Sequence, residues 1–349
     1  MSTNHSFWQD KVGVKGAIRD CPIPTELADD EILIKVRAWG MNPVDAFIQE
    51  VALPFFSYPM IPGEDIAGTV ERVGSGTASQ KFKVGDRVLG YAMGSSSFGK
   101  QERGGFQEYV VVDQNLAAKI PDSVSFGEAS VFPLCMATAG HALFSKEYLG
   151  LPFPKVGGAP EAGKRVLIWG GASGVGSNAI QMAKAAGFEV LTTCSARNFE
   201  YVKSLGADKV FDYTSATVVD DLVAELDQGS ECVGIFQAAG PRDAVAPCIE
   251  VAAKSKGKPF VACANMVPEG AVPEGVTAKF VFERGDGKGI YYETSRVLLG
   301  EFLPTALEAG TYKIAPKPEA VPTKGLEGIQ EALDTVKKGV SAKKIVVEG

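Results

Sequence analysis

The spacing of apolar residues divides the chain into two kinds of pattern. From Lys11 to about Phe132, the apolar residues form short runs separated by turn-forming residues. Short runs that are rich in β-branched and aromatic residues are typical of strands joined by turns. The first part of the chain is therefore predicted to be an all-β module. Its clearest strands are EILIKVRAWG (31–40), IAGTVERVGSG (66–76) and FQEYVVVD (106–113).

From Arg165 onward, apolar strands alternate with helical segments. RVLIWG (165–170) is followed by the alanine-rich stretch NAIQMAKAAG (178–187), and the same order recurs as far as TAKFVFE (277–283). This alternation is typical of a parallel, doubly wound sheet in an α/β fold. The tail after Glu283 holds two helical stretches and the strand KKIVV (343–347). These pieces are too few for a third core, so we expect them to pack on the first module.

The composition narrows the classes of partner. The 349 residues are 45% hydrophobic and 22% charged, with a formal net charge of −7 and no basic cluster. This balance argues against nucleic acid or a membrane as partner and favours a small molecule. The first residues lack a basic stretch followed by an apolar run, so a cytoplasmic protein is expected. Six cysteines without a CxxC pair are expected to be reduced thiols.

The stretch GGASGVG (170–176) lies between a predicted strand and a predicted helix. Small residues at Gly171, Ser173, Gly174 and Gly176 let the backbone approach a pyrophosphate. The N–H groups and the dipole at the start of the following helix favour an anion there. In this context the motif predicts a dinucleotide-binding site, although a glycine-rich turn also simply closes many strand-helix units.

The end of the next strand indicates which dinucleotide binds. NAD-specific sites carry an acidic residue roughly 20 positions after the glycine motif, where it binds the ribose 2′-hydroxyl. Here Ser195 lies 19 residues after Gly176, with Arg197 close behind it. A hydroxyl in place of a carboxylate, beside a cation that can pair with a phosphate, favours NADPH. The competing interpretation is that Arg197 is merely a solvated residue at a helix start.

A set of motifs resembles a known family over essentially the whole chain. The motifs are NPVD (42–45), PGEDIAG (62–68), VGDRVLG (84–90), GGFQEYVVV (104–112), GGASGVG (170–176), KSLGADKVFDY (203–213) and KKIVV (343–347). In this order and spacing, the sequence is similar to the medium-chain dehydrogenase/reductase superfamily, and within it to the zinc-free quinone-oxidoreductase-like branch and fungal trans-acting enoyl reductases. The resemblance implies a GroES-like β-rich catalytic domain over residues 1–131, completed by 284–349, and a Rossmann NADP(H)-binding domain over 132–283.

Zinc-dependent members of that superfamily bind their catalytic metal through cysteine, histidine and a second cysteine or aspartate. The corresponding positions here are Asn42, Glu64 and Leu134. A catalytic zinc needs three ligands drawn from Cys, His and carboxylate, so no metal is expected. Without a Lewis acid, alcohol oxidation loses its main support, whereas hydride addition to a conjugated alkene or a quinone needs less.

The function expected from these features is an NADPH-dependent reductase of activated C=C bonds or quinones. Two alternatives stay open: an alcohol or aldehyde dehydrogenase that acts without zinc, and a non-catalytic NADPH-binding protein. The substrate is expected to be a small molecule or an acyl group bound to a carrier protein. TAKFVFE would be the edge strand of the parallel sheet, which leaves a homodimer open.

The resemblance also implies roles for individual residues. Asn42 would lie beside the nicotinamide, and Thr138 would pack on its ring or bond its carboxamide, unless its hydroxyl only caps backbone. No residue is identified as the proton donor, and His141 is more often a satisfied helix residue than an acid. The residues expected to hold the cofactor are Ala172, Ser173, Gly174, Val175, Ser195, Arg197, Asn198, Tyr213, Cys263, Ala264, Val281, Phe282 and Lys343.

Overall fold

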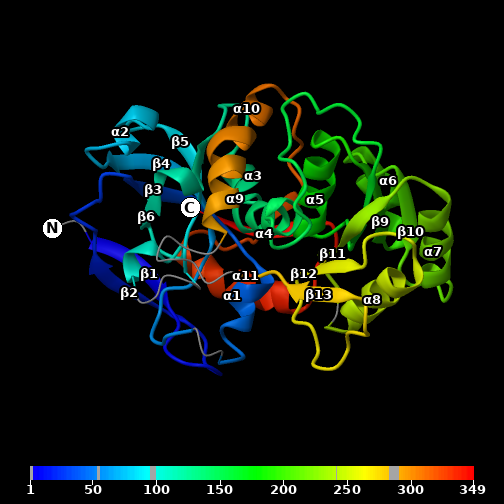
Figure 1. Ribbon diagram of the computed structural model, residues 1–349. Coiled ribbons are helices and arrows are strands. Elements are labelled where there is room, and N and C mark those ends of the chain that lie inside the picture. Colours follow the sequence, from blue (N-terminus) through cyan, green and yellow to red (C-terminus); the bar gives the residue numbers. More distant parts are fainter. Residues whose placement is uncertain (1–2, 53–55, 95–99, 241, 283–290) are drawn as a thin grey trace. The chain divides into compact units, whose positions relative to one another are not determined.

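The computed structural model describes residues 3–52, 56–94, 100–240, 242–282 and 291–349. The chain forms two compact units (Figure 1). The first contains residues 1–134, 284–308 and 314–349, and the second contains residues 135–283 and 309–313. Relative to the predicted division, residues 132–134 belong to the first unit and the short segment 309–313 belongs to the second.

The first unit is built on a seven-stranded sheet in the order β14-β15-β3-β4-β5-β7, with β6 also paired to β3. A separate two-stranded ribbon joins β1 to β2. The strands are β1 (Thr3–Trp8), β2 (Ala17–Pro22), β3 (Glu31–Gly40), β4 (Asp65–Val73), β5 (Arg87–Tyr91), β6 (Tyr109–Asp113), β7 (Ala117–Lys119), β14 (Lys317–Ala320) and β15 (Lys343–Glu348).

Short helices connect these strands. The tail forms one long helical stretch in which the π-helical segment η5 (Leu298–Phe302) separates two α-helical parts. The α-helices are α1 (Pro43–Phe47), α2 (Ala78–Lys81), α3 (Phe126–Ala129), α9 (Tyr292–Val297), α10 (Leu303–Glu308) and α11 (Ile329–Lys337); the 3₁₀ turns are η1 (Gln101–Arg103), η2 (Gln114–Leu116) and η6 (Leu326–Gly328).

The terminal strand β15 completes the first sheet, as the sequence predicts. It runs antiparallel to the end of β3, with Val346 opposite Gly40, and the amide of Met41 donates to the carbonyl of Ile345 at 2.9 Å. This register carries Lys344 to the level of Asn42. Because β15 lies about 300 residues from β3 in sequence, this pairing is a non-local contact that the local pattern alone does not specify.

The second unit holds a six-stranded sheet in the order β10-β9-β8-β11-β12-β13, and all of its strand pairs are parallel. This confirms the predicted doubly wound sheet. Its strands are β8 (Arg165–Trp169), β9 (Glu189–Cys194), β10 (Lys209–Asp212), β11 (Cys232–Gln237), β12 (Phe260–Cys263) and β13 (Thr277–Phe280); its helices are α4 (Pro133–Phe144), which begins in the first unit, α5 (Gly174–Ala185), α6 (Phe199–Ser204), α7 (Val218–Gln228) and α8 (Val245–Lys254), with 3₁₀ turns η3 (Ala196–Asn198) and η4 (Arg242–Ala244).

Both faces of this parallel sheet are covered. Leu167 and Trp169 of β8 pack in one cluster with apolar residues of α7 and α8. Because side chains alternate along a strand, Val166 and Ile168 point to the opposite face, where they are also fully buried. Burial on both faces explains why RVLIW reads as a continuous apolar run instead of an alternating one. Figure 1 shows this sheet and its helices in green to yellow.

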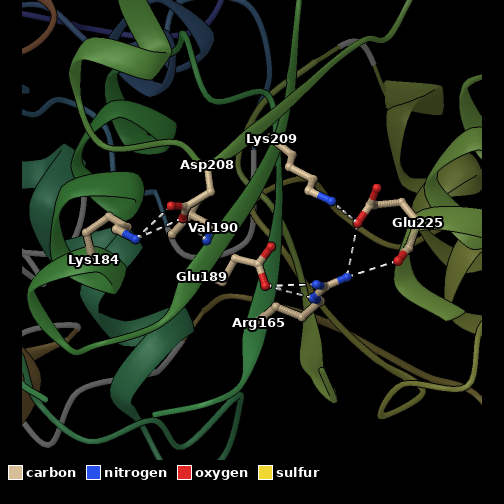
Figure 2. Close-up of polar contacts among 7 residues, drawn as sticks. All are labelled: Arg165, Lys184, Glu189, Val190, Asp208, Lys209 and Glu225. Atoms are coloured by element: carbon tan, nitrogen blue, oxygen red, sulfur yellow. Dashed lines mark hydrogen bonds and ion pairs between the residues drawn. The ribbon is translucent and has the colours of Figure 1, made fainter. Parts of the chain in front are cut away.

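A buried arginine fixes the amino-terminal ends of three of these strands (Figure 2). The guanidinium of Arg165 donates to Oε2 of Glu189 at 2.8 and 3.1 Å and to the carbonyl of Glu225 at 2.9 Å. The guanidinium also donates to a carboxylate oxygen of Glu225 at 3.3 Å, and Lys209 pairs with that carboxylate. These contacts join β8, β9 and β10 to α7. Figure 2 also shows a neighbouring set that joins Lys184, Asp208 and the amide of Val190.

The fold bears on two expectations from the sequence, a homodimer and the absence of a membrane partner. β13 is an edge strand of its sheet, as predicted, and a homodimer through it stays a prediction. Within the residues that the structure describes, no helix is both long and apolar enough to cross a bilayer.

Candidate functional site

The glycine-rich turn after β8 is tied to its neighbours by specific contacts. Oγ of Ser173 caps α5 by accepting from the amide of Gly176 at 2.9 Å, and it donates to the carbonyl of Gly170 at 2.8 Å. A Cβ atom at Gly176 would lie 2.3 Å from that same carbonyl, and one at Gly171 would lie 2.1 Å from Oγ1 of Thr192. Only glycine fits at these two positions, so the start of α5 lies directly against the strand ends.

This turn suits a pyrophosphate. Among the described residues, the backbone amides of Ala172, Gly174 and Val175 have no backbone acceptor; Gly174 and Val175 open a helix of 12 residues, and Ala172 lies just before its cap. Unpaired amides at a helix start bind anions because the helix dipole adds to their partial positive charges. The hydroxyl of Ser173 caps the helix, so its role in the structure is to fix this turn. A contact between Ser173 and the cofactor stays a prediction.

The predicted 2′-phosphate residues gather at the ends of β9 and β10. Ser195 follows β9 directly, and its hydroxyl lies 3.1 Å from the phenol oxygen of Tyr213, which follows β10. Arg197 lies in the turn η3 and is exposed, and Asn198 donates its backbone amide to the carbonyl of Ser195 at 2.8 Å. The structure therefore brings together residues that are separated by up to 18 positions in the chain.

Sequence reasoning missed a carboxylate beside these residues. Asp212 ends β10 and pairs in register with Cys194 of β9. Oδ1 of Asp212 accepts from the amide and the hydroxyl of Thr214 at 2.9 and 2.8 Å. These bonds, together with one from the backbone of Ala196, hold the pKa of Asp212 below its usual value. Asp212 thus ends its strand beside the end of β9, and the turn that carries Arg197 follows β9.

The remaining predicted cofactor residues of the second unit lie at the ends of β12 and β13. The amide of Ala264 donates to the carbonyl of Gln237, and the amide of Val281 donates to the carbonyl of Cys263 at 2.7 Å. The amide of Phe282 donates to the phenol oxygen of Tyr148 at 3.1 Å. All predicted cofactor residues of this unit thus lie at the carboxyl edge of the sheet, where open α/β folds bind their ligands.

The first unit contains a buried polar network where β3, β4 and β15 meet. Oδ2 of Asp65 accepts from Nζ of Lys344 at 2.6 Å and from Nδ2 of Asn42 at 3.0 Å. Nζ of Lys344 also donates to Oδ1 of Asn42, and the amide of Leu134 donates to Oδ1 of Asp65 at 2.6 Å. The side chains of Asn42, Asp65 and Lys344, which we call the Lys344 cluster, are all at most 5% exposed.

Further carboxyl groups surround this cluster. Asp45 and Glu64 are both fully buried, and Oδ2 of Asp45 accepts from the amide of Asn42 at 2.7 Å. Burial raises the pKa of Asp45 to about 7, and the nearby Asp65 adds to the rise. Lys344 contacts Asp65 directly and acts on Asp45 as a nearby positive charge, so its ammonium is the buried cation that partners the Asp65 carboxylate.

Comparison with known proteins identifies the fold and the family. Two family models match the chain: alcohol dehydrogenase GroES-like domain over residues 28–122, and zinc-binding dehydrogenase over residues 174–292. The chain is 43% identical over 338 residues to dehydrogenase azaJ of Aspergillus niger, with 95% of this chain and 94% of azaJ covered. It belongs to the medium-chain dehydrogenase/reductase family.

A further relative and a structural neighbour agree with this result. Trans-enoyl reductase himH of Aspergillus japonicus is 38% identical over 346 residues, with 99% of this chain and 97% of himH covered. The solved structure of mycobacterial Rv1454c complexed with NADPH matches with a TM-score of 0.70 at 23% identity and covers 100% of both chains. The predicted combination of a GroES-like module and a Rossmann sheet in a medium-chain dehydrogenase/reductase is confirmed.

The donor set does not fit the zinc that some medium-chain dehydrogenases use. Two of the zinc-ligand positions, Asn42 and Leu134, both donate to the carboxylate of Asp65, so they lie close together. However, the Asn42 oxygen is bound by the Lys344 ammonium, and Leu134 offers only a backbone amide. Within the described part of the chain, no group of three His, Cys, Asp or Glu residues has metal-binding geometry. A fixed ammonium beside these groups would also repel a divalent cation.

Other predicted site residues lie as follows. Lys343 is exposed and pairs with Glu319 of β14, whereas the buried lysine of the terminal strand is its neighbour Lys344. Thr138 lies in α4 and is half-buried. His141 is 4% exposed, and burial lowers its pKa to about 4, so it is neutral at neutral pH and a poor general acid.

The two adjacent lysines provide a test of the cluster. Lys344→Met should destabilise the protein by about 3 to 5 kcal/mol, because it leaves a buried carboxylate without its cation. Lys343→Met should cost less than about 1 kcal/mol, because its ion pair is exposed. The free energy of unfolding in urea measures both effects. Equal losses in the two variants would contradict the buried ion pair.

The two histidines, the only ones in the chain, should titrate far apart. His141 should titrate near pH 4 because of burial. His5 should titrate above its ordinary value of 6.5, because its ring bonds the carboxylate of Glu108 at 2.9 Å. NMR of the imidazole groups, with His5→Gln to assign them, measures both values.

The same shifts make the stability of the fold depend on pH. The contribution of His5 to stability is present below pH 6.5 and is lost above its raised pKa. The burial of neutral His141 costs stability as the pH falls from 6.5 towards 4. A His141 midpoint near 6.5 would show that the ring is solvated.

Proposed function

We propose that this protein is an NADPH-dependent reductase that transfers hydride to an activated C=C bond or a quinone without a catalytic metal. The observation that carries the proposal is the state of the zinc-ligand positions: the Asn42 amide is bound by Lys344 and Asp65, and Leu134 offers only its backbone. Without a metal to lower the pKa of an alcohol, an acceptor that is already electron-poor is the favoured substrate.

The second unit supports a nicotinamide dinucleotide as cofactor. The open amides of the glycine-rich turn fit a pyrophosphate, and Arg197 beside Ser195 and Tyr213 fits a 2′-phosphate. When bound, the reduced nicotinamide supplies the hydride. Cys263, Ala264, Val281 and Phe282 would hold its carboxamide end through backbone groups at the same sheet edge.

The first unit supplies a fixed polar group for the acceptor. Lys344 binds one end of the Asn42 amide and Asp65 binds the other, so the amide is held in a single orientation. A polar group that does not have to reorient during the reaction stabilises developing negative charge most effectively. We assign Asn42 the role of polar anchor for the reacting groups and Thr138 that of a contact to the nicotinamide ring.

The reaction adds one hydride and one proton. Hydride adds to the carbon β to the carbonyl, the electron pair of the C=C bond moves into an enolate, and the α-carbon then takes a proton. Neutral His141 is unsuited to donate that proton, so we assign the proton to solvent. The similarity to a relative named trans-enoyl reductase favours an enoyl thioester, small or carried by an acyl carrier protein, as the conjugated acceptor.

An acceptor panel tests the proposal. Enones, an enoyl thioester and quinones are offered with NADPH and NADH side by side, and cofactor oxidation is followed. We expect turnover with at least one conjugated acceptor and a Kd for NADPH at least about tenfold lower than that for NADH, because a charge-assisted phosphate contact is worth about 1.5 to 3 kcal/mol.

The control variant is Gly174→Val, whose side chain would lie at the pyrophosphate turn and should abolish NADPH binding while the fold persists. Oxidation of alcohols in place of reduction of the panel would favour the dehydrogenase alternative. Tight NADPH binding without turnover on any acceptor would favour a non-catalytic binding protein.

A further inference from the structure

Two opposite charges flank the predicted ribose end of the dinucleotide site. Ser195 and Tyr213 form a hydroxyl pair at 3.1 Å, with Arg197 two residues after the serine and Asp212 directly before the tyrosine. β9 and β10 are neighbours in the parallel sheet, so their carboxyl ends place these four residues together. The site therefore contains a cation that attracts a phosphate and a carboxylate that repels one.

Asp212 is held in place by the backbone around it. Its Oδ1 accepts from the amide of Thr214 at 2.9 Å and from the hydroxyl of Thr214 at 2.8 Å, and these bonds help to hold its pKa below the usual value. Ala196 is the first residue of the turn that follows Ser195. Because Asp212 pairs in register with Cys194 of β9, this turn starts two residues beyond its partner in the neighbouring strand.

We propose that Asp212 is a specificity-determining residue that limits the affinity of this site for a 2′-phosphorylated dinucleotide. Its fixed negative charge opposes the 2′-phosphate, whereas it has little effect on a ribose that carries a 2′-hydroxyl. Arg197 and Asp212 then set the balance between the two cofactors. This inference rests on the proposed function, because it needs a nicotinamide dinucleotide in the second unit.

The position of the carboxylate separates this role from a structural one. Asp212 ends a strand and forms a local turn with Thr214, and an asparagine keeps an oxygen that can accept the same amide bond. Asp212→Asn therefore removes the charge and retains the turn. A merely structural residue would alter the binding of both cofactors together, whereas a charge at the 2′ position alters only the phosphorylated one.

Calorimetric titration of the intact protein with NADPH and with NADH tests the inference. Asp212→Asn should lower the Kd for NADPH about threefold to tenfold, the range expected for partly exposed charges, and change the Kd for NADH by less than about twofold. The gain should shrink as salt rises from about 50 mM to about 500 mM, because ions screen exposed charges. Arg197→Ala should act in the opposite direction on NADPH alone.

The matched control is Asp220→Asn, which removes an equal charge from α7, where the side chain is 79% exposed and lies outside the predicted site. It should leave both dissociation constants unchanged. An unchanged NADPH affinity in Asp212→Asn, or an equal shift for both cofactors, would overturn the role of Asp212 and leave the proposed function standing. If the unaltered protein bound neither cofactor, the proposed function would fail and this inference with it.

Discussion

A charged side chain in a protein interior needs a partner of opposite charge, and in this protein that requirement fixes the centre of the first unit. Lys344 and Asp65 come from strands far apart in the sequence, 279 residues from one to the other, and both are almost completely buried. Their attraction stabilises the fold only while both are present, because either charge alone would be costly in the interior. The terminal strand must therefore return to β3 before the polar network around Asn42 can form.

In the second unit, the important feature is a set of backbone amides without a backbone acceptor at one edge of the sheet. Gly171 and Gly176 let α5 start directly against the strand ends, so the first amides of the helix stay open at the carboxyl edge. At the opposite edge, Arg165 of β8 bonds Glu189 at the start of β9 and Glu225 of α7 (Figure 2). At their carboxyl ends, β9 and β10 carry the predicted 2′-phosphate residues Ser195 and Tyr213.

Sequence patterns predicted the features that depend on local order. Strand-helix alternation indicated the parallel sheet, and GGASGVG indicated the turn that Ser173 caps. The pattern did not separate Lys343 from Lys344, because that choice depends on the register of β15 against β3, and a shift by one residue turns every side chain to the other face. Counting along the chain found Ser195 but not Asp212, since the carboxylate arrives from the neighbouring strand.

We propose that this protein works without a catalytic metal, because the Asn42 amide is bound by Lys344 and Asp65 and Leu134 offers only its backbone. The most direct test of this proposal is the metal content of protein purified without a metal-affinity tag, measured beside turnover before and after dialysis against a chelator. We expect well under one zinc per chain and an unchanged rate. About one zinc per chain, with activity lost on chelation and restored by added zinc, would contradict it.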